Sequence, residues 1–401
     1  MHVANHTFEI RAFGGGKTPF VTPEACKKSS HHSVVRQDFL NENQGLRSFH
    51  SLNPYFPSRL RREGRKDHSP FLSPCDTGRA STMKKLLRHL APAADIALTP
   101  LVFPAAMIMK AVRRIGTERL PVSKKVLLSV GVFPIRNHYY EPFFDPRSLR
   151  RPLDEKRHLE GIDWNLSGQL ELLNNLTFAD ELQGIPNSRQ NELAFHFNNG
   201  SFEAGDAEFW YQLIRFRKPA RVFEIGSGNS TLMARRAILK NQEEDPGYRC
   251  KHVCIEPYEQ PWLEKLGISV LRQRVEETDK KTFSELESGD ILFIDSSHVI
   301  RPQGDVLFEY LELLPSLKPG VIVHVHDIFS PRDYPQYWLT ERVRFWGEQY
   351  LLEAFLTSNQ SWKIIGALNY LHHDHHDKLK SVCPYLRPEL APGSFYIEKL
   401  C

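Results

Sequence analysis

The sequence predicts an α/β fold built on a doubly wound, mostly parallel sheet. Four short apolar runs between residues 221 and 327 each end in ionisable residues, and the first run leads into a glycine turn and a helix-forming stretch. In open sheets of parallel strands, the carboxyl ends of the strands share one edge, and ligands bind there. Together these observations predict a ligand site at that edge.

The first two runs carry the features of a nucleotide-like site. Arg221 to Ile225 is followed by Gly226-Ser-Gly-Asn229 and then by the helix-forming stretch Ser230 to Lys240. A strand, a tight glycine turn and a helix N-terminus present free backbone N–H groups with no Cβ in the way. His252 to Ile255 ends in Glu256, whose carboxylate can accept hydrogen bonds from both hydroxyls of a ribose.

The next two runs end in groups that can transfer protons or bind metals. Asp290 to Ile294 is followed by Asp295-Ser-Ser-His298, and Val321 to Val325 is followed by His326-Asp327. Since alternate residues of a strand point to the same face, His324 and His326 should share a face. For His324 we expect a buried structural role.

These segments together resemble the class I S-adenosylmethionine-dependent methyltransferases. The resemblance rests on Glu224-Ile-Gly-Ser-Gly-Asn-Ser-Thr231, Glu256, Asp295-Ser-Ser-His298 and His326-Asp327, and it covers roughly residue 198 to the C-terminus. The loop is Glu-x-Gly-x-Gly with no third glycine before the helix, unlike a nicotinamide-binding fingerprint.

The resemblance implies a Rossmann-like, doubly wound, mostly parallel seven-stranded sheet. An N-terminal helical or loop accessory segment and a disordered leader would precede it. Trp362 to Tyr370 and Ser394 to Ile397 match the closing hairpin of this family. Trp338 to Thr357 has apolar residues at helical spacing and is predicted to be a helix.

The resemblance also implies S-adenosylmethionine as the cofactor and assigns residues to its parts. The amino-acid end would be held by Glu224, Gly226, Ser227, Gly228, Asn229 and Ser230, the ribose by Glu256, and the adenine would be bordered by Arg274 or Val275. Asp206 lies on a helix before the first strand, and in relatives such a helix closes over the methionine end of the cofactor.

Methyl transfer is a positioned in-line displacement, so the acceptor hydroxyl needs a base to take its proton or a metal to lower its pKa. The segment is similar to metal-dependent catechol-type O-methyltransferases, in which the aspartate equivalent to Asp295 binds magnesium. The residue three further on, here His298, acts as base, and histidine has a pKa near neutrality. Asp327 corresponds to a second metal carboxylate, but Ile328 stands where those enzymes often have an asparagine ligand.

Several hypotheses stay open for this cluster. The methylation can be metal-assisted with His298 as base, or metal-free with His298 or His326 as base, or the histidines only hydrogen-bond a loop. Methylation of an amine is a further alternative. Outside this class, the chain can be a non-catalytic cofactor-binding or scaffold protein, or an oxygenase-like enzyme with iron bound by two histidines and a carboxylate.

An aromatic, proline-containing loop from Gly131 to Asp145 supplies the candidates for the acceptor site. Aromatic faces beside hydrogen-bonding groups are typical of sugar-binding pockets, and the chain also resembles bacterial carbohydrate-modifying methyltransferases. We therefore predict a small-molecule or glycan acceptor, with contacts from Arg136, His138, Tyr139 and Tyr140. Alternatively, the loop seals the N-terminal segment against the sheet.

Composition limits the partners and the compartment. The net charge of +4 is mild, and no basic stripe is interleaved with aromatic residues, so nucleic acid is not the expected partner. The six cysteines show neither zinc-site spacing nor a disulfide framework, which favours a cytoplasmic protein. A homo-oligomer is compatible with these features.

Residues 1–82 are predicted to be a disordered leader, because they are rich in Lys and Arg and lack a sustained period. Met83 resembles a natural start, and our hypothesis is that the native product begins there. Residues 83–190 are predicted to form an accessory or cap segment, and residues 191–401 the S-adenosylmethionine-binding methyltransferase domain.

Residues 84–114 combine two basic flanks with an apolar stretch between them. The uncharged core, Ile96 to Met109, has 14 residues and contains Pro100 and Pro104, so we expect it to be too short to span a bilayer. It can contact a membrane peripherally, with the basic residues at anionic headgroups, or pack on the catalytic domain or a second subunit.

Overall fold

The chain folds around a seven-stranded sheet, as described by a computed structural model covering residues 76–258 and 260–401, with side chains from Leu90 onward. The strand order is β3-β2-β1-β4-β5-β7-β6, and β7 alone runs antiparallel to its neighbours. The strands are β1 (Arg221–Ile225), β2 (Lys251–Ile255), β3 (Ser269–Leu271), β4 (Ile291–Ile294), β5 (Ile322–Val325), β6 (Trp362–Ala367) and β7 (Phe395–Lys399). The predicted Rossmann-like fold class is confirmed.

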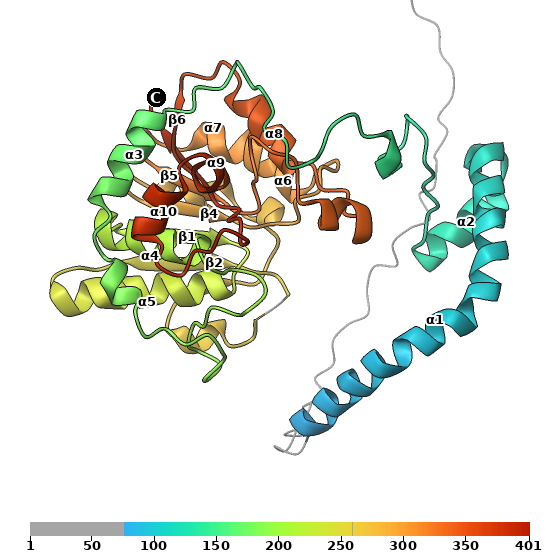
Figure 1. Ribbon diagram of the computed structural model, residues 1–401, viewed down its shortest axis with the longest axis horizontal. Helices are drawn as coiled ribbons and strands as arrows, with labels where there is room; N and C mark the ends of the chain where they lie inside the picture. Colours follow the sequence, from blue (N-terminus) through green and yellow to red (C-terminus); the bar gives the residue numbers. More distant parts are fainter. Residues whose placement is uncertain (1–75, 259) are drawn as a thin grey trace, which may run out of the picture. The chain divides into compact units, whose positions relative to one another are not determined.

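Helices and short helical turns occupy much of the remaining chain (Figure 1). The α-helices are α1 (Asp76–Ile115), α2 (Pro121–Val130), α3 (Leu166–Asn175), α4 (Asp206–Arg217), α5 (Asn229–Glu244), α6 (Asp305–Phe308), α7 (Leu314–Ser316), α8 (Glu348–Leu356), α9 (Leu368–Asp374) and α10 (His376–Val382). The 3-10 turns are η1 (Thr117–Arg119), η2 (Pro146–Ser148), η3 (Ala179–Leu182), η4 (Leu263–Leu266), η5 (Val275–Glu277) and η6 (Lys280–Glu285); η7 (Glu309–Leu313) and η8 (Tyr337–Glu341) are π-helical.

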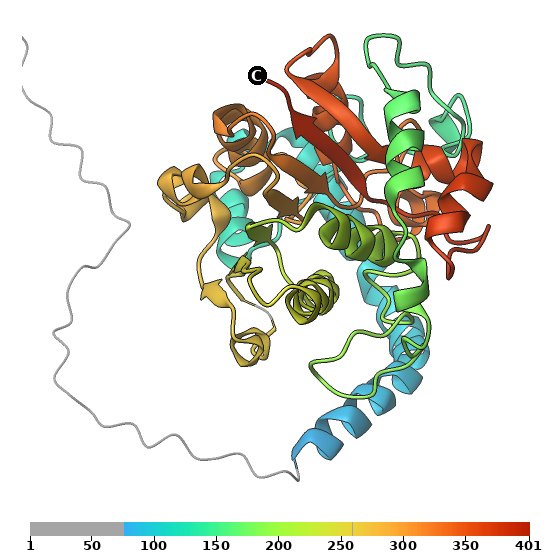
Figure 2. The ribbon, with the colours of Figure 1, turned by 90° about the vertical axis from the view of Figure 1, so that its left-hand side faces the viewer.

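Both faces of the sheet are buried, which explains the apolar runs. Along β1, Val222 points into the core shared with α4 and α5, whereas Phe223 and Ile225 point into the core on the other face. Strand side chains alternate between faces, so a strand that is covered on both sides is apolar almost throughout. Figure 2 shows the strands between α4 and α5 on one side and the segments around α6 and α7 on the other.

The predicted boundary at residue 190 does not separate two hydrophobic cores. Leu172, Leu182 and Ile185 belong to the same core as α4 and α5. The Gln169 side-chain oxygen accepts a hydrogen bond of 2.7 Å from the backbone N–H of Ala367. The later part of the predicted accessory segment 83–190 is therefore an integral layer of the sheet domain.

α1 differs from the prediction in two respects. The helix begins at Asp76, so residues 76–82 are helical, while the remainder of the predicted leader lies outside the described residues. The helix continues through Pro100 and Pro104, and Figure 1 shows it bent along its length, as helix prolines cause. By length and composition alone, Leu90–Ile115 is apolar enough to cross a membrane, which corrects the expectation from the 14-residue core.

Trp338 to Thr357 is not the single helix that its apolar spacing predicts. The π-helical turn η8 and α8 are separated by irregular chain, in which Val343 has a φ of +52°. The backbone N–H groups of Gly347 and Glu348 donate to the carbonyl oxygen of His298 at 2.9 and 3.3 Å. The helix is interrupted where this segment binds the loop that follows β4.

The pH dependence of stability can be predicted from Glu208 on α4. Its carboxylate is fully buried and accepts hydrogen bonds from the backbone N–H groups of Gly205 (2.9 Å) and Tyr385 (2.6 Å). Burial raises the pKa of Glu208 from 4.5 to about 7. Between these pH values the folded state binds more protons than the unfolded state, so the free energy of unfolding falls as pH rises, by about 3 kcal/mol.

We expect Glu208→Gln to remove this loss of stability, measured by urea unfolding at a series of pH values. The matched variant at an exposed site, Glu171→Gln, should retain the wild-type pH dependence. An unchanged pH dependence in Glu208→Gln would contradict the prediction.

Candidate active site

The glycine turn after β1 packs tightly between the ends of β2 and β4. Gly226 has a φ of +77°, and a Cβ built on it would lie 2.0 Å from the carbonyl oxygen of Asp295. The Gly226 N–H donates to the carbonyl of Ile255 at 3.0 Å, and the Asp295 N–H donates to Ile225 at 2.8 Å. Only glycine fits here, both for its φ and for its lack of a side chain.

Glu224 supports this turn from within the core. It shares its face of β1 with Val222, so it points toward α5, where its side chain is fully buried. The hydroxyls of Ser230 and Thr231 donate to its carboxylate at 2.9 and 3.1 Å, and His252 Nε2 contacts its other oxygen. The predicted contact of Glu224 with the cofactor stays a prediction, while the structure assigns it a supporting role at the start of α5.

Glu256 lies at the end of β2, as predicted, and faces the glycine turn. Its carboxylate accepts hydrogen bonds from the backbone N–H groups of Ser227 (3.3 Å) and Tyr258 (3.1 Å). Of the two predicted adenine neighbours, Val275 is buried in the core, and Arg274 donates to the hydroxyl of Tyr258 at 2.8 Å. Tyr258 is 73% exposed and was not predicted from the sequence.

The second part of the site brings together Asp295, His298, His326 and Asp327. His298 Nε2 lies 3.3 Å from Asp295 Oδ1 and 3.6 Å from Asp327 Oδ2, and His326 Nδ1 lies 3.5 Å from Asp295 Oδ1. His298 and Asp327 have φ values of +60° and +59°, so the chain turns sharply at both positions. The predicted gathering of these four residues at the strand ends is confirmed by the geometry.

Three residues that the sequence did not single out hold His298 in place. Glu348 is fully buried at the start of α8, and its Oε2 lies 2.7 Å from His298 Nδ1. The hydroxyl of Tyr310 donates to Glu348 Oε1 at 3.0 Å, and the ring of Trp346 lies 4.2 Å from the His298 ring. Glu348 is 50 residues from His298, so no local sequence pattern indicates their contact.

The protonation of this cluster differs from the expectation for a histidine base. Burial alone would lower the pKa of His298, but hydrogen bonds to Asp295 and Glu348 outweigh it and raise that pKa to about 10. Burial opposes the charge of His326 as well, yet Asp327 and Asp295 raise its pKa well above the usual value. With its carboxylates ionised, the cluster holds His298 as an imidazolium at neutral pH, so His298 cannot accept a proton in that state.

The cluster nevertheless has the donor set of a metal site. Ligand atoms of Asp295, His326 and Asp327 lie within 4.8 Å of one another. His326 Nδ1 is buried and makes no hydrogen bond to a described residue, which is unusual for a polar atom in a core. Ile328 is fully buried and offers no ligand. A nitrogen beside two carboxylates fits manganese or iron as well as the predicted magnesium.

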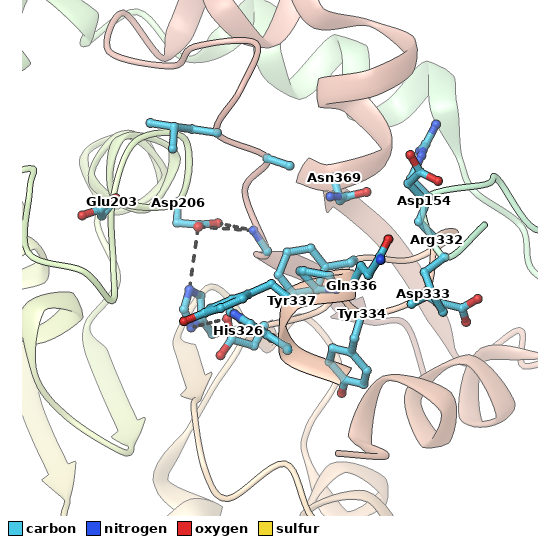
Figure 3. Close-up of a pocket in the computed structure, with 18 of the residues that line it drawn as sticks. Asp154, Glu203, Asp206, His326, Arg332, Asp333, Tyr334, Gln336, Tyr337 and Asn369 are labelled. Atoms are coloured by element: carbon cyan, nitrogen blue, oxygen red, sulfur yellow. Dashed lines mark hydrogen bonds and ion pairs between the residues drawn. The ribbon is translucent and has the colours of Figure 1, made fainter. Parts of the chain in front are cut away.

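A cavity of about 700 Å³ adjoins this cluster (Figure 3). Asp206 and His326 face each other in it, with Oδ2 and Nε2 3.7 Å apart, and Asp206 accepts from the N–H groups of Gly393 and Ser394. The polar and aromatic lining includes Asp154, Glu203, Asp206, His326, Asp327, Arg332, Asp333, Tyr334, Tyr337, Trp338 and Glu389. Asp206 thus lies beside the ionisable cluster, and its predicted contact with the cofactor stays a prediction.

The predicted acceptor residues do not line this cavity. Tyr139 and Tyr140 are about 80% exposed and stack on each other at 3.9 Å, with His138 next to them. Arg136 lines a different cavity together with residues of α1. The loop is held by the ion pair between Arg113 and Glu141, so its aromatic content reflected local stacking and contact with α1.

His324 and His326 share a face of the sheet, as the strand alternation predicts. Both rings pack near Phe202 and Phe293. His324 is fully buried, contacts Ser394 Oγ at 2.8 Å, and has a pKa well below the usual value because of burial. The expected structural role of His324 agrees with this environment.

Comparison with known proteins identifies a methyltransferase domain within this chain. Residues 223–328 match the model of a family described as a methyltransferase domain. An uncharacterized protein from Archaeoglobus fulgidus is 30% identical over 175 residues, which cover 40% of this chain and 76% of that protein. The structure of the plantazolicin methyltransferase BpumL in complex with SAH aligns with 59% of this chain and 99% of its own, at 13% identity and a TM-score of 0.28.

The match over residues 223–328 supports the resemblance of this chain to the class I S-adenosylmethionine-dependent methyltransferases. The matched residues begin in β1 and end just after β5, so they contain the glycine turn, Glu256 and the whole ionisable cluster. Its enzyme class is methyltransferase and its cofactor is S-adenosylmethionine.

The glycine turn generates a prediction about Gly226→Ala. An alanine at the left-handed φ of this position should by itself cost about 1–2 kcal/mol of stability. Its methyl group would also clash with the carbonyl oxygen of Asp295 and displace the turn. We expect a larger drop in the thermal midpoint than for Gly289→Ala, together with loss of S-adenosylhomocysteine binding. Gly289 is a matched control because its φ is +86° and nothing lies within 4 Å of its added Cβ. Equal effects of the two variants would show that the close approach is unimportant.

Proposed function

We propose that this enzyme transfers the methyl group to a hydroxyl of a small molecule or glycan bound in the cavity of about 700 Å³. The observation that carries the proposal is that His326 and Asp327 both line this cavity and belong to the ionisable cluster at the strand ends. A hydroxyl acceptor must lose a proton during methylation, and this cluster supplies titratable side chains at the wall of the cavity.

S-adenosylmethionine supplies the electrophilic methyl group, and the residues around the glycine turn suit it. The carboxylate of Glu256 is fixed by two backbone N–H groups and would accept from the ribose hydroxyls. Gly228 leaves open space where a Cβ would be, with the nearest atom 3.9 Å away, so a ligand can approach the backbone closely. Glu224 would act indirectly, by fixing the first turn of α5.

The acceptor proton would pass to the ionisable cluster. Asp295 and Asp327 favour the charged forms of His298 and His326 through contacts of 3.3, 3.6 and 3.5 Å. Asp295, Asp327 and a deprotonated His326 are the residues that would hold a divalent cation such as magnesium, and the chemistry supplied there would be a lower pKa for a coordinated hydroxyl. If both carboxylates were engaged by a cation, they would no longer hold the proton on His298 Nε2, and His298 would be the residue placed to take the acceptor proton. Glu348 keeps the His298 ring in place through Nδ1.

The cavity lining supports a polyhydroxylated acceptor. Tyr337 and Trp338 offer aromatic faces, and Asp154 and Asp333 offer acceptors for hydroxyl groups. Aromatic faces beside hydrogen-bonding groups are the combination that sugar rings require. This lining replaces the 131–145 loop as the proposed acceptor site.

Methylation of an amine is a second candidate, because acidic groups dominate the same lining. Asp154, Glu203, Asp333 and Glu389 accompany the acids of the cluster, while Arg332 is the one Lys or Arg of the lining within the described residues. A cationic amine would be attracted to such a cavity. Product analysis by mass spectrometry and NMR, with hydroxyl and amine acceptors offered in parallel, distinguishes O-methylation from N-methylation.

Calorimetric titration of the full chain with S-adenosylhomocysteine tests the cofactor site. We expect Glu256→Ala to weaken binding at least about tenfold, since one charge-assisted hydrogen bond contributes about 1.5–3 kcal/mol. Glu277→Ala, at an exposed position of the same sheet edge, is the matched control and should bind normally. Equal affinity of the two variants for S-adenosylhomocysteine would show that Glu256 does not contact the cofactor.

The metal hypothesis is tested with Mn²⁺, whose free and bound forms differ in their electron paramagnetic resonance spectra. We expect Asp295→Asn and Asp327→Asn each to weaken binding at least about tenfold, because each loses a charged ligand. Asp333→Asn removes a carboxylate from the same cavity without touching the cluster, so it should bind like the wild type. Weak wild-type binding that is unchanged in all three variants would favour metal-free methylation.

A further inference from the structure

α1 carries apolar side chains that no described part of the protein covers. Ile96 is 75% exposed, Leu101 69%, Phe103 69% and Ile108 58%. At 100° per residue they point to two positions about 140° apart, and Leu98 (54% exposed) and Val102 (58%) point to the opposite side, so no single polar face remains. A helix that packs on a protein surface shows one apolar stripe, whereas a helix that is apolar all round lies in a core or in a membrane.

The length of this apolar segment suits a bilayer. Leu90–Ile115 has 26 residues, and the apolar window within it is not buried at all. The part before the basic flank, from Leu90 to Met109, has 20 residues and extends about 30 Å, which matches the hydrocarbon core of a bilayer. Apart from Asp95, the stretch is uncharged as far as Met109, and Lys110 begins the basic flank.

A cavity of about 730 Å³ lies at the C-terminal end of the apolar segment. Lys110, Arg113, Arg114 and Arg136 line it together with apolar residues of α1 and of the 132–135 segment, and its lining contains no acidic residue. Four cations around a partly apolar cavity match the phosphate and the adjoining glycerol and acyl carbons of a phospholipid.

Internal contacts hold this cavity open in a defined shape. Arg113 is paired with Glu141 at 2.7 Å and lies over the Phe133 ring at 5.2 Å. Arg136 Nε is buried and makes no hydrogen bond to a described residue. It lies 3.9 Å from Oε1 of Glu141, the residue that is paired with Arg113. One carboxylate therefore faces two arginines, and Lys110 and Arg114 add further positive charge.

We propose that α1 inserts into a lipid bilayer and that the basic cavity at its C-terminal end binds the phosphate of an anionic lipid headgroup. The apolar surface provides the insertion, and the cations at the level where the apolar segment ends provide the preference for anionic lipid. The inference is independent of the acceptor and of the metal. It assigns the enzyme to a membrane surface, in place of a purely cytoplasmic location.

Flotation of the full chain with vesicles tests the insertion. We expect the wild type to float with phosphatidylcholine vesicles and to stay bound in high salt, because insertion is apolar. The double variant Leu101→Asp, Phe103→Asp should lose flotation at least about tenfold, since each aspartate costs about 2.5–3.5 kcal/mol in a bilayer. Leu311→Asp, at a leucine of η7 that is 61% exposed, is the control and should float normally.

The headgroup site is tested by adding phosphatidylglycerol to the vesicles. We expect the wild type to bind the mixed vesicles at least about tenfold more tightly, and Lys110→Glu, Arg114→Glu to lose that preference while still floating with phosphatidylcholine. Lys378→Glu, at an exposed lysine of α10, should keep the preference. Inorganic phosphate added as a competitor should not release the protein, because a free phosphate lacks the acyl chains.

Three results would overturn the proposal. They are release of the wild type by salt alone, equal flotation of the Leu101/Phe103 and Leu311 variants, and an unchanged lipid preference in the Lys110/Arg114 variant. Displacement by inorganic phosphate would instead assign the cavity to a soluble phosphate compound. Circular dichroism and the thermal midpoint of each variant confirm that it is folded before flotation is compared.

Discussion

The active-site edge of this methyltransferase depends on the close approach of Gly226 to the carbonyl oxygen of Asp295. A Cβ at this position would lie 2.0 Å from that oxygen, so the ends of β1 and β4 can meet only because residue 226 has no side chain. The same turn is hydrogen-bonded to the end of β2 through Ile255. The cofactor turn and the ionisable cluster are therefore parts of one arrangement, and a shift of the turn displaces both.

The ionisable cluster is stable only as a network. Buried charges are costly unless they are paired and hydrogen-bonded, and here two histidines are set among Asp295, Asp327 and the distant Glu348. These pairings raise the pKa values of the histidines, so the protonation of each member depends on the others. A cation, a substrate proton or a substitution at any member changes the state of the whole cluster.

The residues predicted at the strand ends lie where the sequence placed them, whereas the residues predicted for the acceptor site do not line the cavity. Glu256 and the four residues of the cluster were placed correctly, because in a parallel sheet the end of a strand fixes the location of the residue that follows it. The acceptor residues Arg136, His138, Tyr139 and Tyr140 were selected by composition, and composition does not state which surface a loop contacts. The cavity is lined instead by residues from segments far apart in the chain, around Asp154, Glu203, Tyr334 and Glu389.

By itself the sequence determined the class of fold, the strand ends and the residues that meet there, since apolar runs and glycine turns are local signals of strands and tight turns. The tertiary structure decided the rest. Glu224 shares a face with Val222 and so supports α5 from the core, and Glu348 reaches His298 only because the 338–357 segment is interrupted to bind the loop after β4. It also decided that α1 continues through its prolines with its apolar residues exposed. Such contacts join residues that are distant in sequence, and local patterns do not encode them.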